Sequence, residues 1–462
     1  MQLRDYQLDI INKVRASMSS GCKHNLIVSP TGSGKTALTA HMIKSAADKG
    51  KSALFIVHRR ELIKQSAAAF DAVGINYGII SSDFPERPFA PVQIASMQTL
   101  TRRLNKLVRV PDLVIHDEAH HIAAKNWSNL FHHFDKSYHI GLTATPRRLD
   151  GKGLGNYFKN MVEGITTAEL IKSGYLADYK YFAGHSLDLT SVHTQMGDYK
   201  KSELAGLVTE NQFVGNAVNE YKKHALGKRA VVFCVNIDHA TIMRRKFLDA
   251  GIPTAHLDGE TPTHERDQTI DKFKCGEIHV LTNVDLFGEG FDLPAIECVI
   301  LLRATQSLSL FLQQVGRSLR PSPGKSHAII IDHVGNLNRH GLPDDERAWT
   351  LDDKKKKDPE PNNRICPKCY AAARTNVYIC ANCGEPLTKP SVPRDPKYLN
   401  EDETELKEID KSARPKKIDL ARASAKTEAD LVELAVSRGY KSPHRWAHHI
   451  FQARQRKKLG IK

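Results

Sequence analysis

Short apolar runs alternate with helix-forming stretches in the first part of the chain. Five such runs lie between residue 20 and about residue 150, at residues 25–28, 53–57, 92–95, 113–116 and 139–142. Strands that are apolar along their whole length are typical of parallel sheets, because helices cover both faces of such sheets. The pattern therefore predicts a parallel α/β domain over residues 1–178.

The same alternation restarts later in the chain, with apolar runs at residues 230–235, 278–281, 298–302 and 328–331. It predicts a second parallel α/β domain over residues 223–342. Residues 180–215 mix polar and aromatic side chains without a clear period, so we interpret residues 179–222 as a connection between the domains. We find no internal repeat beyond the two related units.

The C-terminal part has a different pattern. Residues 343–363 include four consecutive lysines at 354–357, which predicts a charged linker. Residues 364–386 contain four clustered cysteines, and residues 387–426 form a second, acidic and proline-containing linker. Residues 427–462 combine helical spacing with basic side chains. We therefore expect a small cysteine-rich knuckle followed by a basic helical tail.

Neither a membrane span nor a secretory signal is evident. No run approaches the roughly 18 consecutive apolar residues that a membrane helix requires. The first residues lack the apolar stretch and small-residue cleavage site of a secretory signal. We expect a cytoplasmic protein without a membrane partner.

Charge is the first indication of a partner. The chain has 67 basic and 52 acidic side chains, and residues 411–462 alone hold 14 basic and 4 acidic ones. A basic tail most often binds nucleic acid, because binding releases the counterions of the phosphates. A solvated tail that only improves solubility is the alternative.

A glycine-rich segment, residues 29–36, follows the first apolar run and precedes a helix-forming stretch. Backbone N–H groups and a helix N-terminus in such a loop attract polyphosphate, while Lys35 reaches the β- and γ-phosphates and Thr36 can ligate Mg²⁺. Ser29 stands where the strict pattern has its first glycine. The residues predicted to bind nucleotide here are Thr31, Gly32, Ser33, Gly34, Lys35 and Thr36.

An acidic pair, Asp117 and Glu118, follows the run at residues 113–116. The carboxyl ends of parallel strands are where such sheets bind ligands. Asp117 is predicted to hold Mg²⁺, and Glu118 to orient or deprotonate the attacking water in phosphoryl transfer. An exposed acidic turn is the alternative.

The second domain contributes Gln313, Arg317 and Arg320, whose spacing brings them towards one face of a helix. Two arginines from a separate domain can stabilise the charge that develops on a γ-phosphate. Arginines on a solvated helix surface are the alternative. With Lys35, Asp117 and Glu118, these arginines predict a catalytic cleft that closes between two domains.

Taken together, the segments from Leu3 to about His333 resemble the superfamily 2 DNA and RNA helicases, in the same order along the chain. The resemblance implies two RecA-like domains and ATP as the nucleotide. It implies that Gln7 reads the adenine edge, that Thr143 and Thr145 couple hydrolysis to movement, and that Gly290 and Asp292 bind nucleotide. The residues that it implies at the nucleic-acid backbone are Arg59, Arg60, Gln98, Thr99 and Thr282.

Within the superfamily, the Asp-Glu-Ala-His motif, the Gln-x-x-Gly-Arg-x-x-Arg motif and the cysteine cluster are most similar to RadD-type bacterial DNA-repair helicases and their phage relatives. This implies a DNA helicase or translocase that acts on forked or branched DNA in a bacterial or phage-infected cell. Repair or single-strand-binding proteins would be further partners. Gln314, where RNA-directed relatives commonly have arginine, favours DNA. An RNA helicase and an ATP-switched binding protein without unwinding activity are the alternatives.

The clustered cysteines are Cys366, Cys369, Cys380 and Cys383. Two Cys-x-x-Cys pairs are typical of a closed tetrahedral zinc site, which stabilises a segment too short to fold alone. The site should be structural, because four thiolates leave no open coordination position. An iron–sulfur cluster and reduced free thiols are the alternatives.

Overall fold

The computed structural model describes two compact units, residues 1–409 and 410–462, and each is treated by itself. The described residues are 2–58, 60–82, 84–146, 152–183, 189, 191–195, 197–210, 213–286, 296–353, 363–365, 372–374, 407–408, 427–437, 444, 447–448 and 451. Arg59, Gly290, Asp292 and the four clustered cysteines lie outside these ranges, and only the backbone of Arg60 is described. None of the helices within the described residues is long and apolar enough to cross a membrane.

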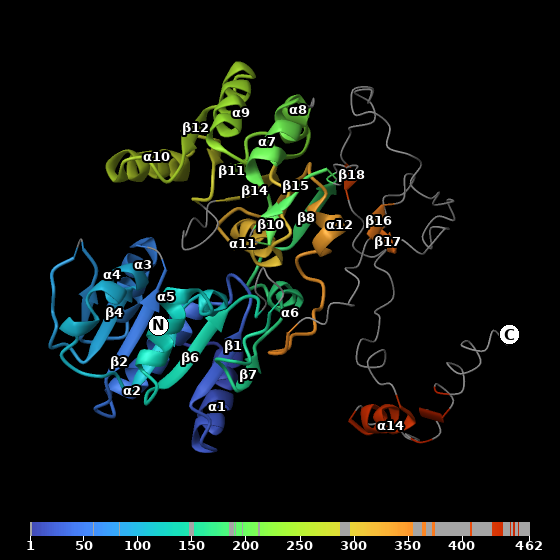
Figure 1. Ribbon diagram of the computed structural model, residues 1–462. Coiled ribbons are helices and arrows are strands. Elements are labelled where there is room, and N and C mark those ends of the chain that lie inside the picture. The colour runs from blue at the N-terminus through green and yellow to red at the C-terminus, as the bar shows by residue number, and fades with distance from the viewer. Residues whose placement is uncertain are drawn as a thin grey trace. The chain divides into compact units, whose positions relative to one another are not determined.

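The first sheet has seven strands in the order β3-β4-β2-β5-β6-β1-β7, and all its pairings are parallel (Figure 1). The strands are β1 (His24–Val28), β2 (Ala53–Val57), β3 (Tyr77–Ile80), β4 (Val92–Ser96), β5 (Leu113–His116), β6 (Tyr138–Thr143) and β7 (Asn160–Glu163). The helices are α1 (Asp5–Ser19), α2 (Lys35–Ala47), α3 (Arg60–Asp71), α4 (Met97–Arg102), α5 (Lys125–His133) and α6 (Thr167–Lys172), with 3-10 turns η1 (Leu104–Lys106) and η2 (Ala119–His121).

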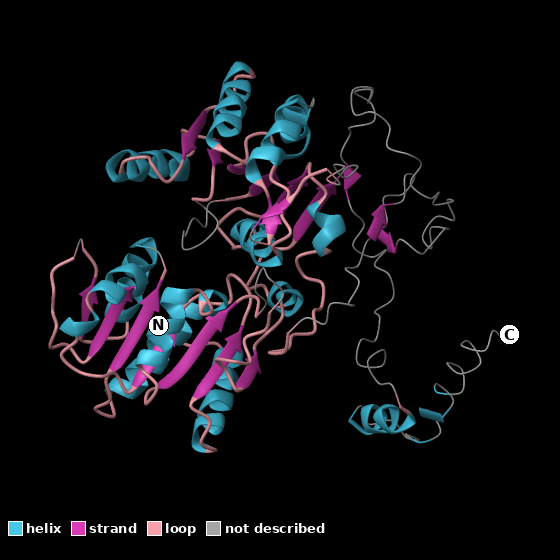
Figure 2. Cartoon of the chain, in the orientation of Figure 1, coloured by secondary structure: helices cyan, strands magenta, loops and turns pink. Residues whose placement is uncertain are grey.

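Helices cover both faces of this sheet (Figure 2). On β2, Phe55 packs into a cluster with Ile43 and Ile63, whereas Leu54 packs into another with Trp127. Successive side chains of a strand point to opposite faces, so a strand buried on both faces is apolar throughout. All five apolar runs expected here are strands.

The second sheet has the order β12-β13-β11-β14-β15-β8-β18, parallel throughout except that β18 runs antiparallel to β8. The strands are β8 (Tyr179–Ala183), β11 (Ala230–Phe233), β12 (Thr254–Leu257), β13 (Val280–Asn283), β14 (Cys298–Leu301), β15 (Ala328–Asp332) and β18 (Lys407–Glu408). The helices are α7 (Lys201–Glu210), α8 (Phe213–Ala225), α9 (Ile237–Asp249), α10 (Thr263–Cys275), α11 (Leu308–Ser318) and α12 (Asn336–His340). Two short pairs lie outside both sheets: β9 (Thr194–Gln195) with β10 (Asp198–Tyr199), and β16 (Asn363–Ile365) with β17 (Ala372–Arg374).

The segment interpreted as a connection, residues 179–222, differs from that expectation. Its first residues form β8, which pairs with β15 inside the second sheet. Lys180 is exposed between the buried Tyr179 and Tyr181, so the strand lacks the continuous apolar run of its neighbours. Helices α7 and α8 complete the segment. It therefore belongs to the second domain.

The beginning of the expected charged linker also differs. Residues 343–353, here called the returning segment, lead from the second domain back to the first. Leu351 accepts a backbone hydrogen bond from Gly155 at 2.9 Å, and the Asp353 carboxylate accepts one from the Gly153 N–H at 2.8 Å. Trp349 packs against the same apolar cluster as Phe158. The sequence did not predict these contacts, because the charged pattern of residues 354–363 suggested that the linker begins at residue 343.

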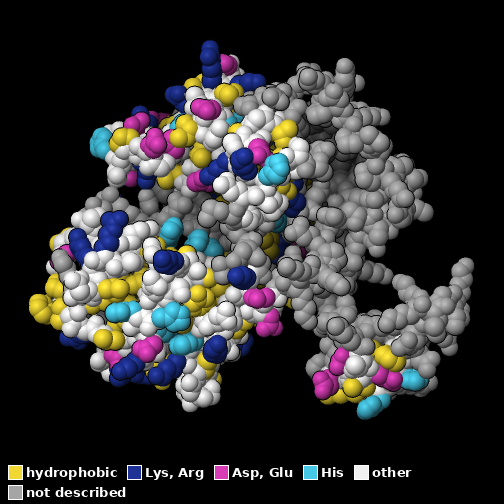
Figure 3. Space-filling model, in the orientation of Figure 1, with side chains coloured by type: hydrophobic (Ala, Val, Ile, Leu, Met, Phe, Trp, Pro, Cys, Tyr) yellow, Lys and Arg dark blue, Asp and Glu magenta, His cyan; other side chains and the backbone are white. Residues whose placement is uncertain are grey.

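The second unit contains α14 (Glu428–Ser437), on which Leu431 is buried together with Ala447. Figure 3 shows acidic and histidine side chains on its described surface, and His448 Nδ1 lies 2.8 Å from Glu428 Oε1. The basic residues of the predicted tail lie outside the described residues. The basic tail, like the zinc knuckle, stays a prediction.

Candidate active site

The phosphate loop, residues 29–36, connects β1 to α2. Gly32 and Gly34 have positive φ values of 85° and 79°, a conformation that other residues rarely adopt. A Cβ atom on Gly34 would lie 2.7 Å from Gln7 Nε2, and one on Gly32 would lie 2.8 Å from a Leu176 methyl group. Both glycines are therefore required by the backbone conformation, and an added Cβ atom would in addition displace the end of a neighbouring side chain. The loop ends at the N-terminus of α2, where phosphate binds favourably.

Lys35 lies over the loop that precedes it. Its Nζ donates to the carbonyl oxygens of Ser29 at 3.1 Å and Pro30 at 3.2 Å. The Ser29 hydroxyl lies 2.8 Å from that of Ser33, so the residue that departs from the strict glycine pattern adds a contact inside the loop. Both of these hydrogen bonds go to carbonyl oxygens. A phosphate oxygen of a bound nucleotide can take the place of either carbonyl as the acceptor.

The charges around Lys35 come from both domains. Burial lowers the pKa of Lys35 below its usual range. The negative charges of Glu118 and Asp117 oppose this effect, whereas the positive charges of Arg317 and Arg320 add to it. The structure thus brings together the five residues that the sequence predicted to be catalytic. Three cations around one point suit a polyphosphate.

Gln7 contacts the phosphate loop. Its amide nitrogen donates to the carbonyl oxygens of Ser33 at 3.1 Å and Gly34 at 3.3 Å, and its amide oxygen accepts from the Arg4 N–H at 3.0 Å. The Tyr6 hydroxyl donates to the same Ser33 oxygen at 2.7 Å. Gln7 and Tyr6 therefore tie α1 to the loop. That role of Tyr6 was not predicted, and contact of Gln7 with adenine stays a prediction.

Glu118 is strained and is contacted from the second domain. Its φ of 48° is unusual for a residue with a side chain and costs on the order of 1 kcal/mol or more, a strain that clusters at functional sites. Gln313 Nε2 on α11 donates to Glu118 Oε1 at 3.2 Å. On the same helix, a Cβ atom on Gly316 would lie 2.9 Å from Thr31 Cβ. Helix α11 thus packs directly against the phosphate loop and Glu118.

Thr143 and Thr145 lie at the end of β6 and are both buried. The Thr143 hydroxyl donates to the Thr145 carbonyl at 2.8 Å and lies 3.2 Å from His120 Nδ1. The same Nδ1 lies 3.3 Å from Glu118 Oε2. The expected coupling residues therefore connect to Glu118 through His120.

The two arginines of the second domain lie beside this site, Arg317 buried and Arg320 partly exposed. Arg317 is 5% exposed. Burial lowers the pKa of Arg320 to about 10. A guanidinium in such surroundings is stabilised by a nearby anion. The arrangement can therefore surround a transferring phosphoryl group with positive charge.

Comparisons with known proteins agree with this geometry. Residues 1–148 match the family described as type III restriction enzyme, res subunit, and residues 212–322 match the helicase conserved C-terminal domain. The chain belongs to superfamily 2 of the helicases. The prediction of an ATP-hydrolysing helicase is confirmed at this level, and ATP and Mg²⁺ are expected for such an enzyme.

Two relatives and one solved structure describe the similarity. The helicase is 36% identical to a "51.5 kDa protein" of Lactococcus phage (isolate 7-9), over 78% of this chain and 77% of that one. It is 33% identical to "Putative ATP-dependent helicase IRC3" of Saccharomyces cerevisiae, over 72% of this chain but only 51% of the yeast protein. A fragment of a putative HsdR subunit of a type I restriction enzyme from Vibrio vulnificus YJ016 shares the fold, with a TM-score of 0.58, 24% identity and coverage of 74% of this chain and 67% of that chain. The prediction of two RecA-like parallel-sheet domains is confirmed.

The helicase residues expected at the nucleic-acid backbone differ in how exposed they are. Gln98 is exposed just after β4, and the Thr99 N–H donates at 3.2 Å to the Oγ of Ser96, which caps the start of α4. Thr282, by contrast, is fully buried, and its hydroxyl lies 3.1 Å from His256 Nδ1. As placed here, Thr282 cannot reach a phosphate.

One functional feature of the helicase was missed. Asp198, in the segment interpreted as a connection, accepts hydrogen bonds from the Thr305 hydroxyl at 2.9 Å and the Gln306 N–H at 2.7 Å. Arg303 lies 3.4 Å from Asp198 and also pairs with Asp285, whose φ is 54°. This Asp198 network holds the turn after β13 and the approach to α11. No local pattern indicates it, because the partners are about a hundred residues apart.

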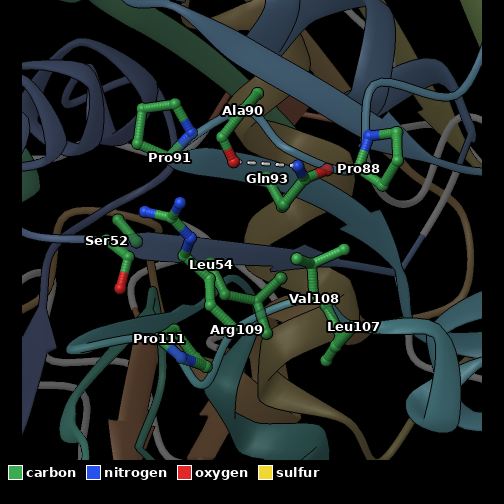
Figure 4. Close-up of a pocket in the computed structure, with 11 residues that line it drawn as sticks. Ser52, Leu54, Pro88, Ala90, Pro91, Gln93, Leu107, Val108, Arg109 and Pro111 are labelled. Carbon is green, nitrogen blue, oxygen red and sulfur yellow. Dashed lines mark hydrogen bonds between the residues drawn. The ribbon is translucent and has the colours of Figure 1, made fainter.

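A pocket at the opposite edge of the first sheet is not part of this site. It lies next to the amino ends of β2 and β4 (Figure 4). Ser52, Pro91 and Arg109 are among the residues that line it, and Gln93 donates to the Ala90 carbonyl there at 3.1 Å. Ligands of parallel sheets bind at the carboxyl ends, so the nucleotide belongs elsewhere.

Proposed function

We propose that this chain is an ATP-dependent DNA helicase or translocase that acts on forked or branched DNA in repair or recombination. The observation that carries the motor function is the hydrogen bond between Gln313 and Glu118 across the two domains. It connects the residue that would activate water to the helix that carries Arg317. A cleft of this kind opens and closes as ATP is hydrolysed.

The roles of the residues follow from their placement. Lys35 would exchange its loop carbonyls for phosphate oxygens. Glu118 would orient the attacking water, and Arg317 with Arg320 would stabilise the charge on the γ-phosphate. Thr36 and Asp117 offer oxygen ligands of the kind Mg²⁺ prefers, and the bound ion would neutralise phosphate charge.

One observation favours DNA over RNA, and the charge of the chain suits either nucleic acid. The matched family and the similar solved structure are both named after restriction enzymes. The chain carries a net charge of +15, which suits binding through backbone phosphates with little sequence specificity. Single-stranded DNA would lie across the exposed ends of the strands, near Gln98.

Steady-state ATPase activity tests this proposal. We would compare no nucleic acid, single-stranded DNA, forked DNA and matched RNA, with Lys35→Ala and Glu118→Gln as inactive variants. DNA should stimulate hydrolysis, and each variant should lose about a hundredfold or more. Lys44→Ala, on the same helix but paired with Asp48 at the surface, is the matched control and should stay active.

Other outcomes would decide between the alternatives. Stimulation by RNA alone would favour an RNA helicase. ATP-dependent binding without displacement of a labelled strand would favour an ATP-switched binding protein. Either result would contradict the proposal.

We further propose that Cys366, Cys369, Cys380 and Cys383 bind one structural zinc ion, a proposal supported by their spacing alone. Metal analysis should return about one zinc per chain, and Cys366→Ser with Cys380→Ser should remove it. Cys275→Ser changes an exposed free cysteine and is the control. Unchanged zinc in the double variant would refute the assignment.

The basic tail is proposed to strengthen DNA binding. Removal of residues 411–462 should weaken binding and reduce its dependence on salt, because 14 basic side chains are lost. If removal of the tail does not change how DNA affinity depends on salt concentration, the tail serves only to improve solubility.

A further inference from the structure

The rings of three histidines are in contact with one another in the first domain, one pair stacked and the other tilted. His58 directly follows β2, and His120 with His121 form most of η2 after β5. The ring centroids of His58 and His121 are 5.1 Å apart at an interplanar angle of 27°, and those of His121 and His120 are 4.1 Å apart at 42°. We call these three residues the histidine ladder.

The ladder reaches the hydrolysis site at one end. His120 Nδ1 lies 3.3 Å from Glu118 Oε2 and 3.2 Å from the Thr143 hydroxyl. Because that nitrogen is in contact with both groups, a movement of the His120 ring changes its contact with the carboxylate. Glu118 already has a strained backbone, so its position depends on such neighbours.

At the other end the ladder reaches the segments expected at the nucleic-acid backbone. The His58 carbonyl oxygen accepts a hydrogen bond from Gln98 Nε2 at 3.3 Å. His58 also directly precedes Arg59 in the sequence. Strands β2 and β5 are neighbours in the sheet, with Ile56 opposite His116, so their following turns lie next to each other.

The rings contact one another in sequence, from His58 to His121 to His120. Within the part of the chain that the structure describes, no group of three His, Cys, Asp or Glu side chains is placed to hold a metal ion. Rings in contact transmit a displacement instead, because close-packed groups are hardly compressible. The ladder is thus suited to mechanical coupling.

We propose that the histidine ladder couples nucleic-acid binding at His58 and Gln98 to the position of Glu118, with His121 as the positioning residue at its centre. This inference rests on the proposed function, because it presumes a nucleic-acid-stimulated ATPase. Nucleic acid that contacts the turn after β2 shifts His58. His121 passes this shift to His120, whose Nδ1 lies 3.3 Å from Glu118 Oε2, and so changes the contact that positions the carboxylate.

The test compares His121→Ala with His121→Phe. In His121→Ala, basal ATPase and the affinity for fluorescent single-stranded DNA should stay within about twofold of wild type, while DNA-stimulated kcat falls about threefold to tenfold, the size of one or two lost ring contacts. His121→Phe keeps the ring and should restore most of the stimulation. His133→Ala, at an exposed histidine of a second adjacent pair on α5, is the matched control.

A double variant adds a second measurement. Gln98→Ala should also reduce stimulation, and combining it with His121→Ala should cost less than the product of the two single effects, because both act through the same ladder. Independent, multiplicative effects would contradict the coupling.

The failures are distinguishable. If nucleic acid does not stimulate the wild-type ATPase, the proposed function and the ladder both fail. If wild type is stimulated and His121→Ala is stimulated equally, only the ladder fails. Equal losses of basal and stimulated activity, or equal losses in His121→Ala and His121→Phe, would also overturn it.

Discussion

The two α/β domains hold their halves of the active site in different ways. The first domain relies on the backbone: Gly32 and Gly34 adopt positive φ values, and Gln7 and Lys35 bond to carbonyl oxygens of the phosphate loop. The second domain relies on charged side chains. Its turns before α11 and after β13 are held by the Asp198 network.

This difference has energetic consequences. A loop fixed by glycine geometry and by hydrogen bonds to its carbonyl oxygens does not depend on an ion pair, so salt should affect it little. A partly buried charge network is stable only while every member has its partner, because one unpaired buried charge is costly. The second domain should therefore be the more sensitive to single substitutions.

The largest expected effect is that of Asp198→Ala. It removes the acceptor of the Thr305 hydroxyl and the Gln306 N–H, and it leaves Arg303, whose side chain is 9% exposed, with Asp285 as its remaining acid. The free energy of unfolding should fall by about 3 kcal/mol. Urea denaturation would measure it. Asp271→Ala breaks an exposed pair with Lys274 and should cost less than about 0.5 kcal/mol. Equal losses of unfolding free energy in Asp198→Ala and Asp271→Ala would show that the Asp198 network contributes no more than an exposed ion pair.

A second prediction concerns buried histidines. In the first domain His139 Nε2 lies 2.9 Å from the Phe134 carbonyl, whereas in the second domain neither ring nitrogen of His239 has a hydrogen-bond partner among the described residues. Burial lowers the pKa of His239 from 6.5 to about 4. The unfolded chain therefore binds more protons between these values, so stability is full above pH 6.5 and is lost as pH falls towards 4.

Measurement at two pH values tests this sign. Between pH 7 and pH 5, His239 alone should lower the free energy of unfolding by about 2 kcal/mol. His239→Leu should remove that share of the pH dependence, whereas His264→Leu, at an exposed position of α10, should keep it. An unchanged pH profile in His239→Leu would refute the prediction.

The first domain's half of the active site could be predicted from the sequence, whereas the side-chain network of the second domain could not. The phosphate loop, Asp117 and Glu118 are short segments next to fully buried strands, so pattern and chemistry coincide within a few residues. Strands β3 and β7 are only partly buried, and their mixed pattern gave no signal. Asp198 could not be recognised, because its role depends on residues that fold back to it from position 303 onwards.

The returning segment illustrates the same limit. Gly153 and Leu351 approach so closely that a Cβ atom on Gly153 would lie 2.0 Å from the Leu351 carbonyl oxygen. Gly153→Ala should displace the segment and cost about 1–2 kcal/mol, as for other overpacked sites. Hydrogen exchange at the Gly155 N–H, which bonds to Leu351, should become faster. Gly206→Ala, where an added Cβ meets nothing within 4 Å, is the control. Unchanged exchange in Gly153→Ala would show that the segment is not held there.

The smallest effect is expected for Lys201→Ala, at the surface of the Asp198 network. Lys201 pairs with Asp285, but their side chains are 51% and 43% exposed. Exposed pairs contribute about 0.5 kcal/mol or less, and salt at about 0.5 M screens most of that. Urea denaturation at low and high salt would test this, with Arg303→Ala as the buried counterpart. Because Arg303 is 9% exposed, its loss should exceed that of Lys201 at both salt concentrations. The opposite ranking would mean that surface charge, and not the buried arginine, holds the turn after β13.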